Sequence, residues 1–260
     1  MTNPIFFGDP AQVAAASPGD TFRLEGPEAR HAVSVKRISA GENVDIVDGA
    51  GRRLTGTVSA TGPSLLELSV EHAAEEPPAA VRFILVQALA KGDRDEQAVE
   101  AATELGVDHV IPWQSDRSIV RWKTEKAVKG QAKWQALTTA AAKQSRRAWI
   151  PGVEPVLDSR GLARRLADTD LVLVLHEEAD APLADAVRNL PGRSADATGR
   201  TAAPAEIAIV VGPEGGISAA ELELLRGAGA LAVRLGPHVL RSSTAGPAAL
   251  AVLNQLLGRW

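Results

Sequence analysis

Two glycine-containing turns, each directly after an apolar run, are the stretches of this sequence best suited to chemistry. The run 207–211 leads into Gly212-Pro213-Glu214-Gly215-Gly216, and the run 230–235 leads into Gly236-Pro237. Glycine allows a tight turn and lets a ligand approach main-chain N–H and C=O groups closely. Such groups suit a planar heterocycle with donors and acceptors, such as adenine. Neither turn has the motif of a dinucleotide or nucleoside triphosphate site, so neither of these ligands is expected.

A polar segment, Arg241-Ser242-Ser243-Thr244, follows the second turn and precedes an apolar stretch that ends near Leu257. A guanidinium stays protonated at any working pH and can stabilise negative charge that develops on a substrate. Arg241 is therefore the first candidate for a catalytic residue, and Glu214 is the second. In the alternative interpretation, Arg241 pairs with Glu214 and only holds the two turns together. No metal site is expected, because cysteine is absent and no second histidine lies at ligand spacing from His176.

The elements that position these residues can be predicted from apolar periodicity and capping signals. The β-branched run 207–211 predicts a buried parallel strand. Ser218, with Glu221 three residues later, predicts a capping box that starts a helix ending near Gly227 or Gly229. Strands at 82–89, 108–112 and 171–175, with a helix at 95–105, predict a parallel α/β sheet. Ligands bind at the carboxyl ends of such strands, although two ordinary strand-to-helix turns would give the same local pattern.

The N-terminal part of the chain has a different pattern and predicts a separate domain, residues 1–73. Short strands are predicted at 21–24, 43–47, 52–59 and 65–70, with a hairpin turn at 48–51 and one helix at 27–38. Glu75-Glu76-Pro77-Pro78 predicts a linker, because Pro-Pro continues neither a sheet nor a helix. The second domain is expected over residues 74–260. Its segment 191–204, rich in small polar residues, Gly and Pro, predicts a mobile loop.

Three motifs of the second domain together resemble the C-terminal signature of the RsmE family of SPOUT-class methyltransferases. These motifs are Gly212-Pro213-Glu214-Gly215-Gly216-Ile217-Ser218, Leu235-Gly236-Pro237 and Leu240-Arg241-Ser242-Ser243-Thr244-Ala245. Segments 28–37, 87–92 and 104–107 also resemble the family, so the match covers both domains. The chain departs from the family at Ser243, where members often carry Glu, and a carboxylate there cannot be essential in this protein.

The resemblance implies methylation of N3 of a uridine in small-subunit (16S) ribosomal RNA, with S-adenosylmethionine as the cofactor. It implies a deep trefoil knot at about residues 171–258 around the parallel sheet, and a PUA-like RNA-binding β-barrel at residues 1–73. The implied cofactor-binding residues are Leu175, His176, Gly212, Pro213, Glu214, Gly215, Gly216, Leu235, Gly236, Leu240, Ser242, Ser243, Thr244 and Ala245. A homodimer is also implied, and the apolar stretch 247–257 has the composition of a helix that seeks a partner.

Ribosomal RNA as the partner requires a local basic surface, because the whole chain has a net charge of −4. The region 115–147 is the most basic, and Trp122, Trp134 and the nearby Trp149 have rings that could stack on unpaired bases. In the alternative, the tryptophans pack inward and the lysines are only solvated. The candidate RNA-binding residues are Arg30, Lys36, Arg37, Arg52, Arg53, Arg117, Arg121, Lys143, Arg146 and Arg147.

Several classes of protein are excluded or kept as alternatives. No apolar run approaches the ~20 residues of a membrane span, and no signal peptide is evident, so a cytoplasmic location without membrane attachment is expected. The first alternative function is a SPOUT enzyme that methylates a ribose 2′-oxygen. The second is a non-catalytic, RNA-binding ribosome assembly factor.

Overall fold

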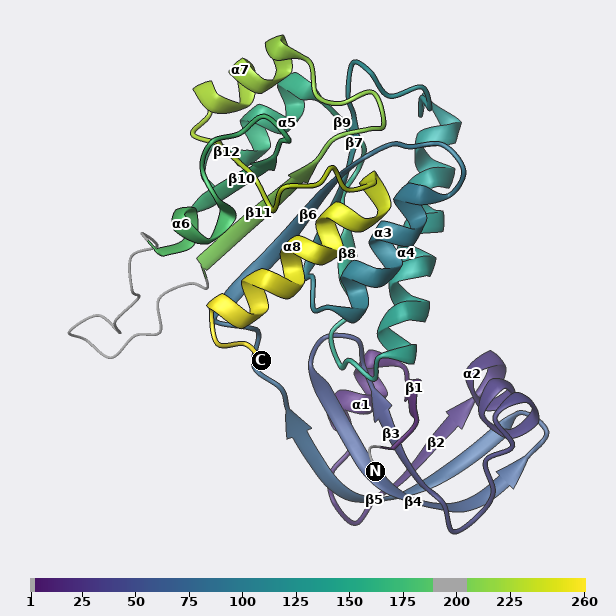
Figure 1. The fold of residues 1–260 in the computed structure, drawn as a ribbon. Coiled ribbons are helices and arrows are strands. Elements are labelled where there is room, and N and C mark those ends of the chain that lie inside the picture. Colours follow the sequence, from purple (N-terminus) through teal and green to yellow (C-terminus); the bar gives the residue numbers. More distant parts are fainter. Residues whose placement is uncertain (1–2, 189–204) are drawn as a thin grey trace. The chain divides into compact units, whose positions relative to one another are not determined.

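The structure, a computed structural model, describes residues 3–188 and 205–260, and the chain divides into two compact units (Figure 1). The first unit is Met1–Pro78 together with Ala142–Ile150, and the second is Ala79–Ala141 with Pro151–Trp260. The sequence placed the boundary at residue 73, whereas the last strand of the first unit continues to Glu75. The loop predicted at 191–204 lies outside the described residues.

The first unit is a curved five-stranded sheet with the strand order β1-β3-β4-β5-β2. Only the β1–β3 pair is parallel. Alternating side chains such as Leu54, Leu66 and Leu68 fill a core on one face, as the half-buried pattern of an antiparallel sheet requires. The elements are β1 (Ile5–Phe7), α1 (Pro10–Ala15), β2 (Thr21–Glu25), α2 (Gly26–Arg30), η1 (His31–Val35), β3 (Asn43–Val47), β4 (Arg52–Gly62) and β5 (Leu65–Glu75).

Two local features of this unit differ from the sequence prediction. The single helix expected at 27–38 is a short α-helix, α2, followed by the π-helical turn η1. The turn is closed by the bond from Lys36 N–H to the His31 carbonyl, and the chain then leaves the helix through Arg37 at φ 59°. Strand β1 was not predicted, because three residues are too few to show alternation.

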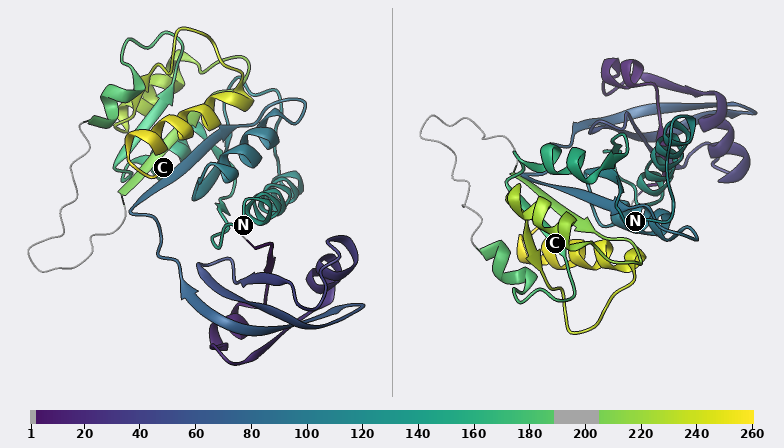
Figure 2. Two further views of the ribbon diagram at one scale, coloured as in Figure 1. Left: turned by 60° about the horizontal axis from the view of Figure 1, so that its bottom comes forward. Right: turned by 90° about the horizontal axis from the view of Figure 1, so that it is seen from above.

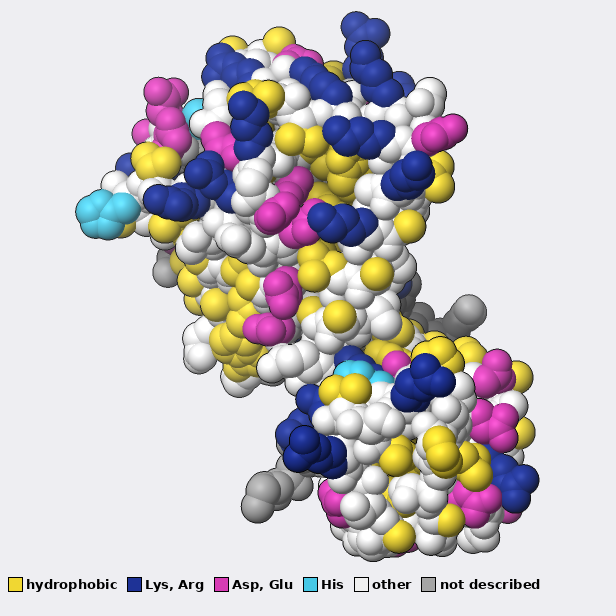
Figure 3. All heavy atoms as spheres, turned by 90° about the vertical axis from the view of Figure 1, so that its right-hand side faces the viewer, with side chains coloured by type: hydrophobic (Ala, Val, Ile, Leu, Met, Phe, Trp, Pro, Cys, Tyr) yellow, Lys and Arg dark blue, Asp and Glu magenta, His cyan; other side chains and the backbone are white. Residues whose placement is uncertain are grey.

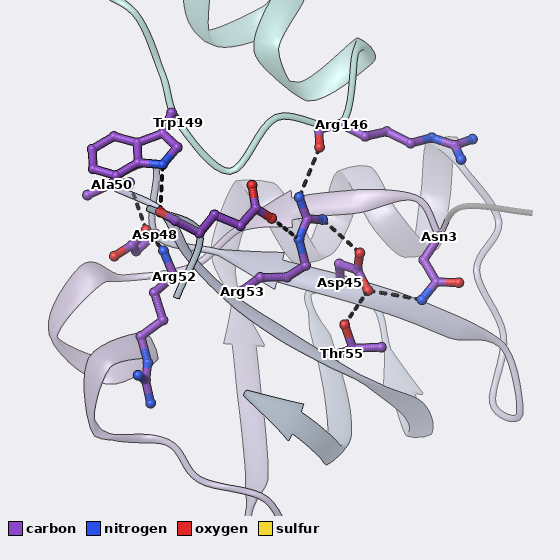
Figure 4. Close-up of polar contacts among 10 residues, drawn as sticks. Asn3, Asp45, Asp48, Ala50, Arg52, Arg53, Thr55, Arg146 and Trp149 are labelled. Atoms are coloured by element: carbon purple, nitrogen blue, oxygen red, sulfur yellow. Dashed lines mark hydrogen bonds and ion pairs between the residues drawn. The ribbon is translucent and has the colours of Figure 1, made fainter. Parts of the chain in front are cut away.

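The segment Ala142–Ile150, far from the first unit in sequence, is held in it by specific contacts (Figure 4). Arg53 donates to the Arg146 carbonyl at 3.1 Å and pairs with Asp45 at 2.7 Å. The Trp149 indole N–H donates to the Glu76 carbonyl at 3.0 Å. Ala148 is buried in an apolar cluster with Ile5 and Val47. These residues therefore complete the first unit.

The second unit is built around an all-parallel sheet of seven strands, ordered β12-β10-β11-β6-β7-β8, with β9 also pairing with β7. The predicted parallel α/β architecture is confirmed. Its strands are β6 (Val81–Ala88), β7 (His109–Gln114), β8 (Gly152–Val153), β9 (Leu157–Asp158), β10 (Leu171–Leu175), β11 (Ala205–Val211) and β12 (Leu231–Val233). Its helices are α3 (Arg94–Glu104), α4 (Glu125–Gln144, of which residues 142–144 belong to the first unit), α5 (Ser159–Leu166), α6 (Leu183–Arg188), α7 (Ala219–Gly227) and α8 (Ser242–Leu256).

Helices cover both faces of this sheet, as the turned views show (Figure 2). Phe83 and Leu85 of β6 pack in one apolar core with residues of α3, α4, α6 and α8. Ile84 and Val86, on the opposite face, pack with residues of α5 and α7. Burial on both faces explains why the strands are continuous apolar runs. Within the described ranges, none of the helices combines the length and apolar character that a bilayer crossing requires.

Candidate functional site

A cavity of about 720 Å³ lies in the second unit where the carboxyl ends of β10 and β11 meet the start of α8. The glycine turn after β11 forms one wall, and Leu175 and His176 form another. Further lining residues include Arg94, Arg117, Val239, Leu240, Arg241, Ser242 and Ala245. A smaller adjacent cavity of about 90 Å³ is lined by Leu235 and Gly236, among other residues. The two turns singled out in the sequence thus meet at one edge of the sheet, as the strand rule predicts.

The four glycines of these turns differ in how strongly the backbone requires them. Gly216 has φ +73°, where side chains are disfavoured. A Cβ at Gly212 would lie 2.7 Å from the Ile217 Cγ1 atom, and one at Gly215 would lie 3.2 Å from the Arg117 Cβ atom. A Cβ at Gly236 meets nothing within 4 Å. The first turn is therefore tightly constrained, whereas Gly236 is not required for steric reasons.

Two arginines from neighbouring loops clamp the glycine turn. Arg117, in the loop after β7, donates from Nη1 to the Gly215 carbonyl at 3.0 Å. Arg94, at the start of α3, contacts the Glu214 carboxylate at 3.2 Å, and the Lys91 N–H donates to the same carboxylate at 3.2 Å. Arg94 was not predicted as a site residue, although it follows the turn at the carboxyl end of β6 and the strand rule could have found it.

Arg241 lines the cavity, is exposed, and forms the N-cap of α8 without capping the helix through its side chain. The ion pair of Glu214 is with Arg94. In residues 3–188 and 205–260, Arg241 has no ion pair, so the alternative pairing of Arg241 with Glu214 is not formed. The guanidinium of Arg241 is available to a ligand.

The first turn of α8 supplies a further group for a ligand. Ser242 is 8% exposed and lines the cavity, and its hydroxyl has no hydrogen-bond partner among the described residues. A buried hydroxyl without a partner is costly and is satisfied when a bound molecule supplies one. Ser243 and Thr244 line neither cavity, although the sequence placed both at the cofactor.

His176 is oriented by backbone contacts at the rim of the cavity. Its main-chain N–H donates to the Val233 carbonyl at 3.0 Å, and its Nδ1 accepts from the Glu178 N–H at 3.2 Å. Because Nδ1 is an acceptor, the neutral ring carries its proton on Nε2 and is a donor toward solvent or ligand. The described part of the chain contains no group of three or more His, Asp or Glu side chains that could hold a metal ion.

Several of the predicted RNA-binding residues have partners within their own unit. In the first unit, Arg52 donates to the carbonyls of Val13 and Ala16, while Arg53 and Lys143 are in ion pairs. In the second unit, Arg121 donates to the carbonyls of Ser115 and Asp116. These side chains shape the fold and have few donors left for phosphate. The exposed members of the set are Arg30, Lys36, Arg37, Arg117, Arg121 and Arg146, and Arg147 is half-buried. Of the exposed members, Arg117 and Arg121 also donate to carbonyls within the second unit.

The interleaved tryptophans do not form a base-stacking surface. Trp134 is 1% and Trp122 9% exposed, and their rings pack edge to face with centroids 5.2 Å apart. The inward-packing alternative is therefore correct for these two residues. On the face shown in Figure 3, Lys and Arg side chains gather over the upper part of the second unit, with Asp and Glu side chains among and below them.

Comparison with known proteins identifies the family to which the chain belongs. Residues 77–254 match a family described as an RNA methyltransferase domain, and residues 24–71 match an RNA methyltransferase PUA domain. Ribosomal RNA small subunit methyltransferase E of Mycobacterium tuberculosis (strain CDC 1551 / Oshkosh) is 40% identical over 241 residues, covering 91% of this chain and 87% of the relative. The chain belongs to the ribosomal RNA small subunit methyltransferase E family. A Bacillus subtilis (strain 168) member is 30% identical, with 90% of each protein covered.

Solved structures related to this family show the same fold. The crystal structure of a ribosomal RNA small subunit methyltransferase E from Neisseria gonorrhoeae, bound to S-adenosyl methionine, has a TM-score of 0.82 at 28% identity and covers 98% of both chains. A putative methyltransferase from Legionella pneumophila, in complex with the bound cofactor SAM, has a TM-score of 0.79 at 26% identity, again covering 98% of both chains.

Proposed function

We propose that this protein is an S-adenosylmethionine-dependent methyltransferase that methylates N3 of a uridine in 16S ribosomal RNA. The observation that carries the proposal is the cavity at the carboxyl ends of β10 and β11, which brings the family's glycine turn and Arg241 together. A relative with the same fold binds this cofactor, and the curated relatives named above carry the ribosomal activity in their names.

The residues of the cavity fit the cofactor. Its volume of about 720 Å³ lies within the usual range for sites that hold ligands of this size. The constrained backbone of residues 212–216 and the unpartnered Ser242 hydroxyl offer polar contacts, and Leu175, Leu240 and Ala245 offer apolar ones. When bound there, S-adenosylmethionine supplies an activated methyl group on its sulfonium.

The protein's own task is to place and stabilise the uracil ring. Neutral uracil carries a proton on N3, so attack by this nitrogen requires loss of that proton and creates negative charge on the ring. Arg241, the catalytic residue in this proposal, stabilises that charge. We assign Glu214 to anchoring the glycine turn, because Arg94 and the Lys91 N–H both contact its carboxylate. The target base must be unpaired or extruded to expose N3.

The remaining parts of the proposal concern RNA and assembly. Residues of the first unit form a PUA-like RNA-binding barrel, with Arg30, Lys36 and Arg37 exposed toward phosphates. The segment at about 171–258 forms the trefoil knot, and the protein acts as a cytoplasmic homodimer. The strand order is consistent with a knot, because the chain reaches β12 at one edge and then returns across β10 and β11 to place α8 against β6 and β11.

Two other functions remain as alternatives to be tested. A ribose 2′-O-methyltransferase would use a similar cavity but modify the sugar. A non-catalytic assembly factor would not bind the cofactor, and calorimetry with S-adenosylmethionine separates it from both enzymes.

Mapping of modified nucleotides in 16S rRNA from a strain that lacks this protein tests the proposal. One N3-methyluridine should be missing, and the wild-type chain should restore it while Arg241→Lys restores much less. An unchanged set of modified nucleotides in the deletion strain would overturn the proposal.

A further inference from the structure

A buried carboxylate outside the lining of the cavity connects the loops that shape it. Glu221, in the first turn of α7, is 2% exposed. Its Oε1 accepts from the Asp116 N–H at 2.8 Å and from the Ser159 hydroxyl at 2.7 Å. Its Oε2 accepts from the Ser218 N–H at 3.0 Å and from the Ser115 hydroxyl at 3.4 Å. All four donors are uncharged, so the carboxylate is held by hydrogen bonds from neutral groups.

These donors come from three different segments of the second unit. Ser115 and Asp116 follow β7 and directly precede Arg117, the residue that donates to the Gly215 carbonyl. Ser218 follows the glycine turn and caps α7. Ser159 begins α5. Glu221 is therefore connected to the glycine turn in two ways. It accepts a hydrogen bond from Ser218, which follows the end of the turn, and it accepts one from Asp116, whose neighbour Arg117 contacts Gly215 at the centre of the turn.

The chemistry of this position requires a carboxylate. Burial of a charge is costly, and it is tolerated when several donors satisfy both oxygens. Burial raises the pKa of Glu221, but the hydrogen bonds from Ser159, Asp116 and Ser218 outweigh it and lower the pKa below its ordinary value. A glutamine of the same shape would place an NH₂ group against either the Asp116 or the Ser218 main-chain N–H. Neither N–H can turn to become an acceptor, so one of the two contacts must open.

We propose that Glu221 is a positioning residue for the cofactor. By fixing Asp116 and Ser218, it holds Arg117 against the Gly215 carbonyl and keeps the glycine turn in its ligand-binding conformation. The inference rests on the proposed function, because it takes S-adenosylmethionine as the ligand of the cavity.

The test is a double-mutant cycle on cofactor binding, measured by calorimetry without RNA. Glu221→Gln and Arg117→Met should each weaken S-adenosylmethionine binding about tenfold, as loss of a hydrogen bond to a charged group does. Because both changes release the same contact, the double variant should bind no more than a few-fold more weakly than either single variant. The proposal would be overturned if the double variant lost affinity by the product of the two single losses, or if Glu221→Gln bound S-adenosylmethionine normally.

A matched control separates positioning from general stability. Glu154 forms an ion pair with Arg165 at 2.8 Å in the same unit and does not line the cavity. Glu154→Gln should lower the urea midpoint without changing cofactor affinity. If Glu221→Gln does not fold, Ser159→Ala, which removes one donor, should weaken binding by a smaller factor, and normal binding by that variant would overturn the proposal.

Hydrogen exchange distinguishes a failure of this inference from a failure of the proposed function. The amides of Gly212 and of residues 214–218 should exchange faster in Glu221→Gln than in the wild type, while Glu154→Gln should leave them unchanged. A wild type that does not bind S-adenosylmethionine would contradict the proposed function. Unchanged exchange in Glu221→Gln would contradict the positioning role, whatever the ligand.

Discussion

At the scale of single residues, the three arginines of the cavity have different tasks. Arg94 and Arg117 both contact the glycine turn. Arg94 pairs with the Glu214 carboxylate, and Arg117 donates to the Gly215 carbonyl. Arg241 has no such contact with the described residues and faces the cavity from the start of α8. Of these three arginines, Arg241 therefore has its whole guanidinium available for the charge that develops on a substrate.

Substitution of Arg241 by Lys should slow the chemical step. We expect the single-turnover rate to fall ~10²-fold or more with little change in cofactor affinity, because an ammonium cannot reproduce the planar donors. Rapid-quench measurement with saturating RNA and cofactor checks this. Arg94→Lys is the control, because it should weaken cofactor binding or stability more than the chemical step. A rate within a few-fold of wild type for Arg241→Lys would remove this residue from the mechanism.

The Glu221 carboxylate should make stability depend on pH in a defined direction. Its pKa is lower in the folded protein than the ordinary value of 4.5, so its contribution is fully present above about pH 4.5. That contribution is lost as the pH falls through the lower folded pKa. The difference in unfolding free energy between wild type and Glu221→Gln should therefore be constant near neutral pH and shrink in acid. Urea unfolding over a pH series checks this, and a difference that grows in acid would contradict it.

At the scale of elements, the glycine turn is the rigid part of the site. Gly215→Val should weaken S-adenosylmethionine binding at least ~10-fold while the protein still folds, because the new Cβ lies 3.2 Å from the Arg117 Cβ atom. Gly236→Val is the matched control and should weaken binding less, since a Cβ at Gly236 meets nothing within 4 Å. Calorimetry measures the S-adenosylmethionine affinity of both variants. An equal loss of affinity in the two would show that the turn at residues 212–216 is not the constrained element.

Local sequence signals predicted most of these elements correctly. Strand β11, the Ser218–Glu221 capping box of α7, and α8 all have strong signals within a few residues, and all are confirmed. What the sequence could not show is pairing over long separations. The hydrogen bond from Arg53 to the Arg146 carbonyl and the ion pair of Arg94 with Glu214 produce no periodic pattern in the sequence. For the same reason the sequence did not reveal the internal partners of Arg52, Arg53 and Lys143, because a basic residue in an internal ion pair looks the same in sequence as one that faces solvent.

At the scale of the whole molecule, α8 has apolar residues on a second side. Leu250 and Leu253 are buried in the core, while Val252 and Leu256 are 39% and 47% exposed. We expect a symmetric dimer that covers this exposed side, with a mass of twice 27.2 kDa in light scattering. Leu256→Glu should give monomers, whereas Val128→Glu on α4, at a residue 69% exposed, should not. A wild-type monomer at micromolar concentration would contradict the dimer.

RNA binding should depend on the exposed cations of the first unit. The double variant Arg30→Ala with Lys36→Ala should bind rRNA more weakly and show a shallower dependence on salt, with the slope smaller by about one for each phosphate that is no longer neutralised. Its cofactor affinity should be unchanged. Arg23→Ala, which breaks a surface pair with Glu67, is the control and should bind RNA nearly as the wild type does. Filter binding over a salt series checks this, and an unchanged slope in the double variant would move the RNA site elsewhere.

The most direct test of the central claim is methyl transfer by the purified protein. Small ribosomal subunits from a strain that lacks the protein are incubated with it and with S-adenosylmethionine carrying a labelled methyl group, and the rRNA is digested to nucleosides. We predict that the label appears in 3-methyluridine and that Arg241→Lys transfers it far more slowly. Label in a 2′-O-methylated nucleoside, or no transfer by a protein that binds the cofactor, would contradict the account.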